Sequence, residues 1–268
     1  MLRRTQIKNT ALKISRPLFS NAIHCQRHSN VPIRRLSPES RSLHSSTLAH
    51  PPPLLVSIEG NIGAGKSTVI DRLKLLNPTW VFIDEPVGVW SDLVNENNES
   101  LLEIYYQDRK RWSYTFQNCA LLTRYKNIEA AVAQRSSGSQ ERLSSGRRQV
   151  FVTERCLETD YHVFTKMLHS DGSINKLEYE LYQQWFSHLK RSATPLSAIV
   201  HINTTPEDCV ARIANRGRVG EENIHVDYLQ ALHKHQMDWI QSGMVPCLRT
   251  NTAGLSAVHT FVNGLASS

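Results

Sequence analysis

The residues from Gly60 to Ser67 fit the pattern G-x-x-x-x-G-K-[ST], which is typical of a loop that binds nucleotide phosphates. Glycines let such a loop turn tightly and point amide N–H groups at phosphate oxygens, and the helix that follows adds the positive end of its dipole. Lys66 would reach the β- and γ-phosphates, and the Ser67 hydroxyl would ligate Mg²⁺. We therefore expect a nucleoside triphosphate to contact Gly60, Asn61, Ile62, Gly63, Ala64, Gly65, Lys66, Ser67 and Thr68.

Three further charged residues stand where two predicted strands end. Glu85 follows one strand, and a carboxylate at the carboxyl end of a parallel strand points into the crevice where ligands bind. It could there accept the proton of an attacking hydroxyl as a general base. Glu154 and Arg155 follow another strand, where the acid could hold Mg²⁺ and the arginine could steady the base. Taken alone, surface acids and an exposed ion pair explain these residues better, so other motifs have to decide.

A stripe of polar and small residues follows at helical spacing. Tyr106, Ser113, Gln117, Ala120 and Arg124 recur every three, four or seven residues, which places them on one face of a predicted helix. Tyr, Gln and Arg among small residues suit a pocket wall that recognises a small flat ligand. Gln can make the paired donor and acceptor contacts that the edge of a base requires. A solvated helix face is the alternative.

Arginines gather after the fourth predicted strand. Arg212 and Arg216 are four residues apart on one helix face, Gly217 loosens the chain, and Arg218 and Glu221 follow. Arginines on a mobile segment near a phosphate loop suit a lid that closes over a transferring phosphoryl group. A charged surface turn is the alternative.

The elements that must position these residues alternate between strand-like and helical runs, which predicts a parallel sheet with crossover helices. We expect five strands, at Leu54–Ile58, Trp80–Ile83, Val150–Thr153, Ala198–Ile202 and Val245–Leu248. We expect helices near residues 66–76, 101–134, 159–169, 176–190, 205–215, 226–241 and 255–265. Thr205 followed by Pro206 marks one helix start, with Thr as the N-cap.

The net charge of +7 is concentrated at the N-terminus. Residues 1–50 contain nine Lys or Arg and one acid, so this segment carries +8 and the rest of the chain −1. An Arg-rich, Ser-rich and acid-poor leader is typical of a mitochondrial transit peptide. We therefore predict a leader over residues 1–52, one folded domain over 53–268, and localisation in the mitochondrial matrix. A disordered basic tail without a targeting role is the alternative.

The remaining composition excludes several classes of partner. The folded part has no excess of basic residues, so we expect no binding to nucleic acid. No apolar run approaches the roughly 18 residues that a membrane-spanning helix needs, so we expect no membrane partner. The five Cys are scattered and odd in number, which argues against a disulfide framework or a zinc site.

Taken together and in this order, the motifs resemble those of the deoxynucleoside kinase family from Val56 to about Ile240. They are Ile58-Glu59-Gly60-Asn61-Ile62 leading into Gly65-Lys66-Ser67-Thr68, Glu85-Pro86-Val87 with Trp90, Arg111-Trp112-Ser113-Tyr114-Thr115-Phe116-Gln117, Glu154-Arg155, and Arg216-Gly217-Arg218 with Glu221-Glu222. The resemblance implies an α/β P-loop kinase fold with a five-stranded parallel sheet flanked by helices and an Arg-rich lid. It also implies ATP with Mg²⁺ as the phosphoryl donor, a deoxyribonucleoside as the acceptor in nucleotide salvage, and a homodimer.

The same resemblance implies a role for each site residue. Glu85 would be the general base for the sugar 5′-hydroxyl, with Arg155 and Lys66 as its catalytic partners. Ser67 and Glu154 would hold the metal. The remaining substrate contacts would come from Tyr106 and Glu221 at the 3′-hydroxyl, Gln117 at the base edge, and Trp90 and Phe164 around the base ring, while Arg212, Arg216 and Arg218 would form the lid.

Ala120, Arg124 and Asp160 indicate which base is accepted. Members of the family that prefer deoxycytidine or deoxyguanosine are similar to this chain at these positions, whereas thymidine-preferring members carry small or apolar residues. A long Arg124 side chain crowds the space that a thymine methyl group would need. An Arg–Asp pair also offers donors and acceptors to amino and carbonyl groups. We therefore expect purine deoxynucleosides and deoxycytidine to be preferred over thymidine.

Two other functions are open to a chain of this kind. A non-catalytic mitochondrial assembly subunit could retain a kinase-like fold, since a fold does not guarantee its usual function. Such a protein would be expected to lose residues such as Lys66, Glu85 or the lid arginines, which are all present here. A kinase for nucleoside monophosphates is the other alternative, but Tyr106, Gln117 and Glu221 favour an uncharged nucleoside.

Overall fold

The computed structural model describes residues 51–137 and 147–268. The predicted leader at residues 1–52 lies outside the described residues except for its last two positions. Over the described ranges, no helix is long and apolar enough to cross a membrane.

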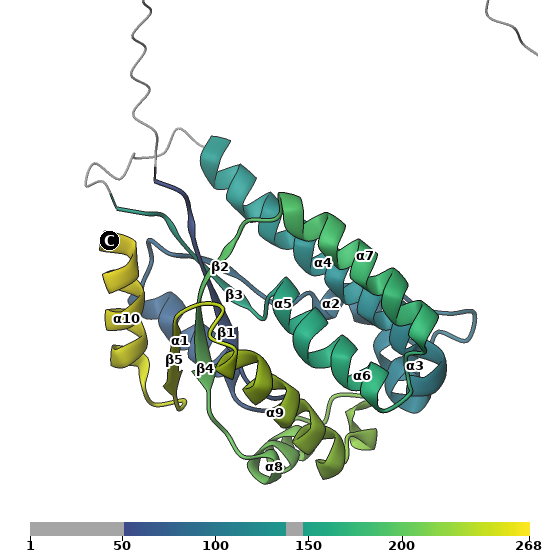
Figure 1. Cartoon of the computed structure of the whole chain (residues 1–268). Helices are drawn as coiled ribbons and strands as arrows, with labels where there is room; N and C mark the ends of the chain where they lie inside the picture. The colour runs from purple at the N-terminus through teal and green to yellow at the C-terminus, as the bar shows by residue number, and fades with distance from the viewer. Residues whose placement is uncertain (1–50, 138–146) are drawn as a thin grey trace, which may run out of the picture. The chain divides into compact units, whose positions relative to one another are not determined.

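Within these ranges, five parallel strands form one sheet in the order β2-β3-β1-β4-β5 (Figure 1). They are β1 (Leu54–Glu59), β2 (Val81–Ile83), β3 (Val150–Glu154), β4 (Leu196–Ile202) and β5 (Cys247–Thr250). The predicted parallel α/β sheet is confirmed, although β5 begins later than the expected Val245. Because all pairs are parallel, the carboxyl ends of the strands meet at one edge, where ligands bind in such sheets.

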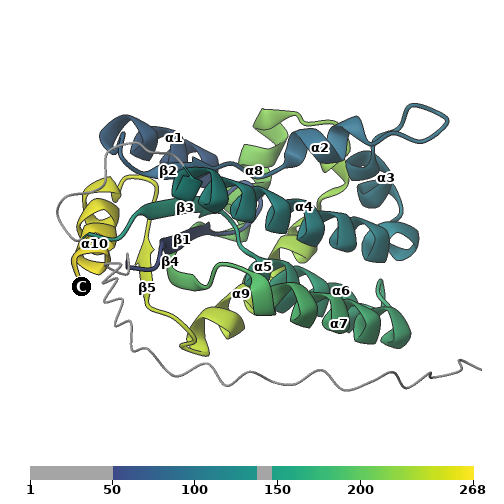
Figure 2. The ribbon, with the colours of Figure 1, turned by 90° about the horizontal axis from the view of Figure 1, so that it is seen from above.

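Both faces of the sheet are covered, because the side chains of each strand alternate between two layers of helices. Leu54, Val56 and Ile58 of β1 pack in one apolar cluster with residues of α1 (Lys66–Leu76) and α10 (Leu255–Ser267). Leu55 packs on the opposite face with Ile128 of α4 (Arg109–Ser137). The two helices α1 and α10 lie beside each other in both Figure 1 and Figure 2.

Nine further helical segments complete the described part of the chain. They are α2 (Val87–Asp92), α3 (Leu101–Gln107), α5 (Leu157–Thr159), the π-helical η1 (Asp160–Thr165), α6 (Lys166–Ser170), α7 (Lys176–Ser192), α8 (Pro206–Arg216), the 3₁₀ turn η2 (Glu221–Asn223) and α9 (Val226–Gln241). The predicted N-cap of α8 is confirmed, since the Thr205 side chain accepts a hydrogen bond from the Asp208 N–H.

The helix predicted over 101–134 is wrong as a single element, because the chain breaks at Asp108 between α3 and α4. The backbone of Asp108 leaves the helical region, and its side chain accepts a hydrogen bond from the Arg111 N–H at 3.0 Å. A short acid that caps a new helix competes with continuation of the old one. Tyr106 therefore lies on a different helix from Gln117 and Arg124. The run predicted at 159–169 is helical, but residues 160–165 form a π-helical segment.

Candidate active site

A cavity of about 570 Å³ opens at the carboxyl ends of β1, β2 and β3. Most of the predicted site residues line it: Ile62, Gly63, Gly65, Lys66, Ser67, Thr68, Glu85, Trp90, Tyr106, Gln117, Ala120, Arg124, Glu154, Arg155, Asp160, Phe164, Arg212, Arg216, Arg218 and Glu221. The three exceptions, Gly60, Asn61 and Ala64, belong to the phosphate loop but bind other parts of the chain. Asn61 Nδ2 donates to the Leu229 carbonyl at 2.8 Å, and the Ala64 carbonyl accepts from Arg212 at 2.9 Å.

Three glycines of the phosphate loop have positive φ values, and the steric need for glycine is clearest at Gly60 and Gly63, where backbone atoms lie close. Gly60 and Gly63 have φ values of +149° and +77°, which side-chain-bearing residues rarely adopt. A Cβ atom on Gly60 would lie 2.9 Å from the Ile202 carbonyl oxygen, and one on Gly63 would lie 2.7 Å from the Cys209 carbonyl oxygen. The loop therefore packs against β4 and α8 with no room for a side chain.

Lys66 is buried at the base of the cavity. Its Nζ atom donates to the Asn61 carbonyl at 2.9 Å and lies 3.6 Å from Glu154 Oε1. Burial, together with the nearby positive charge of Arg155, lowers the pKa of Lys66 to about 8. An incoming phosphate would offset both effects, so this ammonium group is placed to gain from an anionic ligand.

Ser67 and Glu154 form the predicted metal position. The Ser67 hydroxyl donates to Glu154 Oε2 at 2.9 Å, so a hydroxyl oxygen and a carboxylate converge on one point. Over the described ranges, no cluster of three or more His, Cys, Asp or Glu could hold a metal ion by itself. Mg²⁺ usually takes one or two protein oxygens and completes its shell with water and phosphate oxygens, so this pair fits Mg²⁺ bound with a nucleotide.

Glu85 is held by two arginines from different elements. Arg124 of α4 and Arg155, which follows β3, each donate to Glu85 Oε1 at 3.2 Å. Burial by itself would raise the pKa of Glu85, but the charges of Arg155 and Arg124 outweigh it and hold that pKa at about 2. The carboxylate is therefore ionised near neutral pH. Arg155 adopts φ +64°, an uncommon conformation that marks strain at a functional position.

Arg124 organises the inner wall of the cavity and is only 2% exposed. Besides Glu85, its guanidinium donates to Asp160 Oδ2 at 2.9 Å and to the Glu154 carbonyl at 2.7 Å. Burial raises the pKa of Asp160, and the adjacent Arg124 charge opposes that shift. The predicted Arg–Asp pair is thus present, and Arg124 also contacts Glu85, the proposed general base.

Gln117 is 1% exposed, and its Oε1 atom has no hydrogen-bond partner among the described residues. A buried acceptor without a partner carries a desolvation cost, so a ligand that donates a hydrogen bond would satisfy it. Aromatic rings adjoin this wall: Trp90 meets Phe116 edge-on at 5.3 Å between ring centroids, and the Arg155 guanidinium lies 4.9 Å from the Phe164 ring centroid. The lining therefore combines apolar faces with one free acceptor, as a nucleobase would require.

Two of the three predicted lid arginines, Arg216 and Arg218, are engaged with an acid. Arg216 binds the Glu221 carboxylate through two guanidinium nitrogens at 3.0 and 2.7 Å, and Arg218 adds a contact at 3.2 Å. Glu221 is 3% exposed, whereas the arginines are partly open to solvent. Because these side chains line the cavity, they can reach a ligand there by exchanging partners.

The family model for deoxynucleoside kinases matches residues 56–260. The chain belongs to the deoxynucleoside kinase family. Deoxycytidine kinase 2 of Gallus gallus is 34% identical over 200 residues, which cover 69% of this chain and 73% of that protein. Deoxycytidine kinase of Homo sapiens is 32% identical with 69% and 74% covered, and the mitochondrial deoxyguanosine kinase of Xenopus laevis is 31% identical over 198 residues with 69% and 72% covered.

Sequence reasoning missed several residues of this deoxynucleoside kinase that line the cavity, among them Leu102, Tyr105 and Phe116. Phe116 stands directly before the predicted Gln117, and Tyr105 stands directly before the predicted Tyr106. The sequence signal for these two residues is that they stand next to polar site residues. An apolar residue in such a position is equally typical of the hydrophobic core.

Proposed function

We propose that this kinase transfers the γ-phosphoryl group of ATP, or of another nucleoside triphosphate, to the 5′-hydroxyl of a deoxyribonucleoside. The observation that carries the proposal is that an ionised Glu85 and the phosphate-loop residue Lys66 line one cavity. Arg124 and Arg155 both donate to Glu85 Oε1, and we assign Oε2 to the 5′-hydroxyl. A carboxylate with a low pKa is a weak base, which suits a loose phosphoryl-transfer transition state that depends mainly on positioning.

The phosphate side of the reaction falls to residues of the loop and the lid. Amide groups of the loop and Lys66 would hold the β- and γ-phosphates, with Arg212, Arg216 and Arg218 on the opposite side. Mg²⁺, bound with the nucleotide near Ser67 and Glu154, would neutralise part of the phosphate charge. The full set of these residues favours catalysis over a non-catalytic assembly role.

The direct test is an assay of the purified full chain with ATP–Mg²⁺ against the four deoxynucleosides. We expect formation of 5′-monophosphates, with purine deoxynucleosides and deoxycytidine used better than thymidine. A chain that phosphorylates no deoxynucleoside, and that binds neither nucleoside nor nucleotide by calorimetry, would contradict the proposal.

For base selection, the supporting observation is the Arg124–Asp160 pair beside Ala120 and Gln117. Replacing the pair by Arg124→Met with Asp160→Ala removes its bulk and its donors, so we expect the ratio of thymidine to deoxycytidine use to rise by about tenfold or more. The ratio is the readout, because loss of the Arg124–Glu85 contact also lowers turnover with every acceptor. An unchanged ratio across the four nucleosides contradicts this assignment.

We place the protein in the mitochondrial matrix. The support is the +8 charge of residues 1–50 and the name of one relative, the mitochondrial deoxyguanosine kinase of Xenopus laevis. A fluorescent protein fused behind residues 1–52 should enter mitochondria, and replacing the arginines of that leader by glutamine should keep it in the cytosol. Cytosolic fluorescence of the unaltered fusion would contradict the localisation.

We also propose a homodimer that forms through α4 with α7 beside it. Exposed apolar side chains support this arrangement, namely Leu122 on α4 and Leu177, Leu181 and Trp185 at four-residue spacing on α7. Size-exclusion chromatography with light scattering should give twice the chain mass for the full chain. Trp185→Glu should shift it to the monomer mass, and a monomeric unaltered chain would contradict the proposal.

A further inference from the structure

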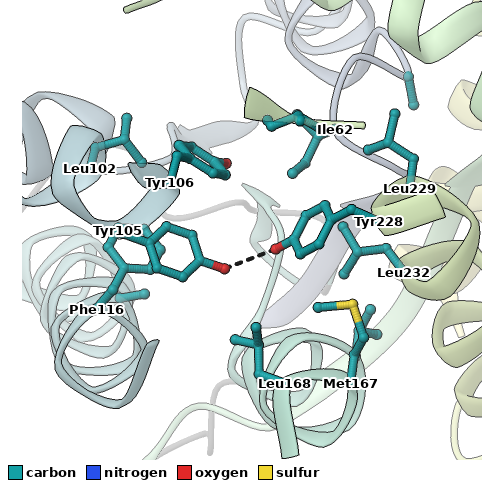
Figure 3. Close-up of a cluster of buried hydrophobic side chains, with 14 of the residues drawn as sticks. Ile62, Leu102, Tyr105, Tyr106, Phe116, Met167, Leu168, Tyr228, Leu229 and Leu232 are labelled. Carbon is teal, nitrogen blue, oxygen red and sulfur yellow. Dashed lines mark hydrogen bonds between the residues drawn. The ribbon is translucent and has the colours of Figure 1, made fainter. Parts of the chain in front are cut away.

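Two tyrosine hydroxyls meet at the edge of the proposed site, where Tyr105 lines the cavity. Tyr105 lies on α3 and Tyr228 on α9, and their hydroxyl oxygens are 2.8 Å apart (Figure 3). The two side chains are 1% and 7% exposed. Apolar residues surround the pair, including Ile62, Met167 and Leu232. Where water is excluded, a hydrogen bond has no competing partner, and breaking it leaves a buried polar group unsatisfied.

Further contacts fix the geometry of both rings. Tyr105 stacks on Phe116 with 4.3 Å between ring centroids and 10° between ring planes. The guanidinium of Arg109 lies 4.7 Å from the ring centroid of Tyr228. Each tyrosine is thus held by a neighbour on α4, so the hydroxyl contact joins groups that are already oriented.

The pair joins α3, which carries Tyr106, to α9, which closely follows the turn that carries Glu221. Tyr106 directly follows Tyr105 on α3, and Glu221 lies in η2, close before the start of α9. The turn at Gly220 packs so tightly on α3 that a Cβ atom there would lie 3.1 Å from the Cα atom of Glu103. The turn before η2 therefore contacts α3 at Gly220. The two tyrosines make a second link, between α3 and α9.

We propose that Tyr105 and Tyr228 form a latch, the hydroxyl pair just described, that positions Tyr106 and Glu221 to recognise the 3′-hydroxyl of the acceptor sugar. This inference rests on the proposed function. The ring of Tyr105 lines the cavity, but the two hydroxyls bind each other, so in this proposal they position Tyr106 and Glu221 and do not contact the sugar themselves. Loss of either hydroxyl lets α3 move relative to η2 and weakens a contact that only a sugar with a 3′-hydroxyl can make.

The test compares a 2′-deoxynucleoside with its 2′,3′-dideoxy analogue in the full chain and in the variants Tyr105→Phe, Tyr228→Phe and the double variant. Each single variant should lower the preference for the deoxynucleoside, measured as the ratio of kcat/KM values, by about fivefold. The KM for the deoxynucleoside should rise while the KM for ATP stays the same. The double variant should lose no more than one single variant, because one missing hydroxyl already breaks the latch.

Tyr179→Phe is the matched control. It removes a hydroxyl from another tyrosine pair, in which Tyr179 and Tyr161 have their oxygens 3.4 Å apart, and Tyr179 does not line the cavity. The control should keep the ratio of the unaltered chain. Calorimetric affinities for the two nucleosides provide the same comparison without turnover, and thermal unfolding checks that each variant is folded.

Three outcomes would overturn the latch: a ratio that stays unchanged in both single variants, losses that multiply in the double variant, or an unaltered chain that acts on both sugars equally. An unaltered chain that neither phosphorylates nor binds any deoxynucleoside contradicts the proposed function instead. Should Tyr105→Phe fail to fold, Tyr228→Phe decides the matter on its own.

Discussion

Charge holds the proposed catalytic carboxylate in place. Glu85 would have an elevated pKa from burial alone, yet Arg155 and Arg124 keep it ionised and restrict its position. Both arginines contact the same oxygen, Oε1, which leaves Oε2 for the proposed contact with the 5′-hydroxyl. A change at this residue therefore tests proton transfer more than folding.

Glu85→Gln keeps the shape of the side chain and one acceptor oxygen but cannot take up a proton. We expect kcat to fall by about a hundredfold to ten-thousandfold while the protein stays folded. Steady-state kinetics and thermal unfolding of the purified variant measure the two effects. Asp84→Asn is the control, because Asp84 is the neighbouring exposed acid and is paired with Lys74. A variant with near-normal kcat would remove Glu85 from the role of base.

Glu59 is a buried carboxyl that is fully enclosed at the end of β1. Its Oε1 atom accepts hydrogen bonds from the Ser57 and Thr159 hydroxyls, and its Oε2 atom has no partner among the described residues. Burial raises the pKa of Glu59, and the charge of Arg155 opposes that shift. These contacts tie β1 to the residues just before Asp160, so the carboxyl has a structural role.

We expect Glu59→Gln to fold with little change in stability, because the amide reproduces the size and the Oε1 acceptor of a protonated carboxyl. Glu59→Ala leaves the Ser57 and Thr159 hydroxyls without their acceptor and should lower the free energy of unfolding by about 1–3 kcal/mol. Urea denaturation of the two variants measures the difference. Equal destabilisation by both changes would show that the negative charge matters.

At the scale of elements, helix ends determine where the site residues stand. Thr205 caps α8, which carries Arg212 and Arg216 toward the cavity. Asp108 ends α3 and starts α4, so Tyr106 and Gln117 approach the cavity from two helices. Short polar side chains at such positions satisfy N–H groups that the helix itself leaves open.

Thr205→Ala should lower the free energy of unfolding by about 1 kcal/mol, because the N–H of Asp208 loses its side-chain acceptor. Thr205→Ser keeps a hydroxyl at the same place and should recover most of the loss. Equilibrium unfolding in urea gives both values. A Ser variant as unstable as the Ala variant would assign the effect to the lost methyl group.

The sequence was enough to predict the elements whose signals are local. The phosphate loop, the β–α alternation and the Thr-Pro helix start each depend on neighbouring residues, and the structure agrees with them. The break at Asp108 was missed, because an acid within a helical pattern is ordinarily an exposed helix residue. The pairing of Tyr105 with Tyr228 spans 123 positions, and no periodicity along the chain connects them.

For the whole molecule, stability should depend on pH through a buried histidine of the central sheet. His201 of β4 is 1% exposed, and burial lowers its pKa to about 4 from an ordinary value near 6.5. As pH falls from 6.5 to 4, the unfolded chain takes up a proton that the folded chain refuses. The stability associated with His201 is thus complete above pH 6.5 and is lost through this window.

The expected loss between pH 6.5 and pH 4 is about 3 kcal/mol from His201. Urea unfolding of the full chain at several pH values measures it. His201→Gln cannot take up a proton and should remove this contribution, while His162, whose pKa burial also lowers to about 4, keeps its own. A variant profile as steep as that of the unaltered chain would assign the acid sensitivity to other groups.

Arg155 binds both the phosphate loop and Glu85. Its Nη1 atom donates to the Gly60 carbonyl at 3.0 Å, while its Nε atom donates to Glu85. One guanidinium therefore links Glu85, the proposed general base, to the phosphate loop and restrains the distance between them. If Glu85 is the base, folding of the chain would set the spacing between acceptor and phosphates in advance, and acceptors of different size would be accommodated by movement of other residues that line the cavity, such as those of α3 and η2.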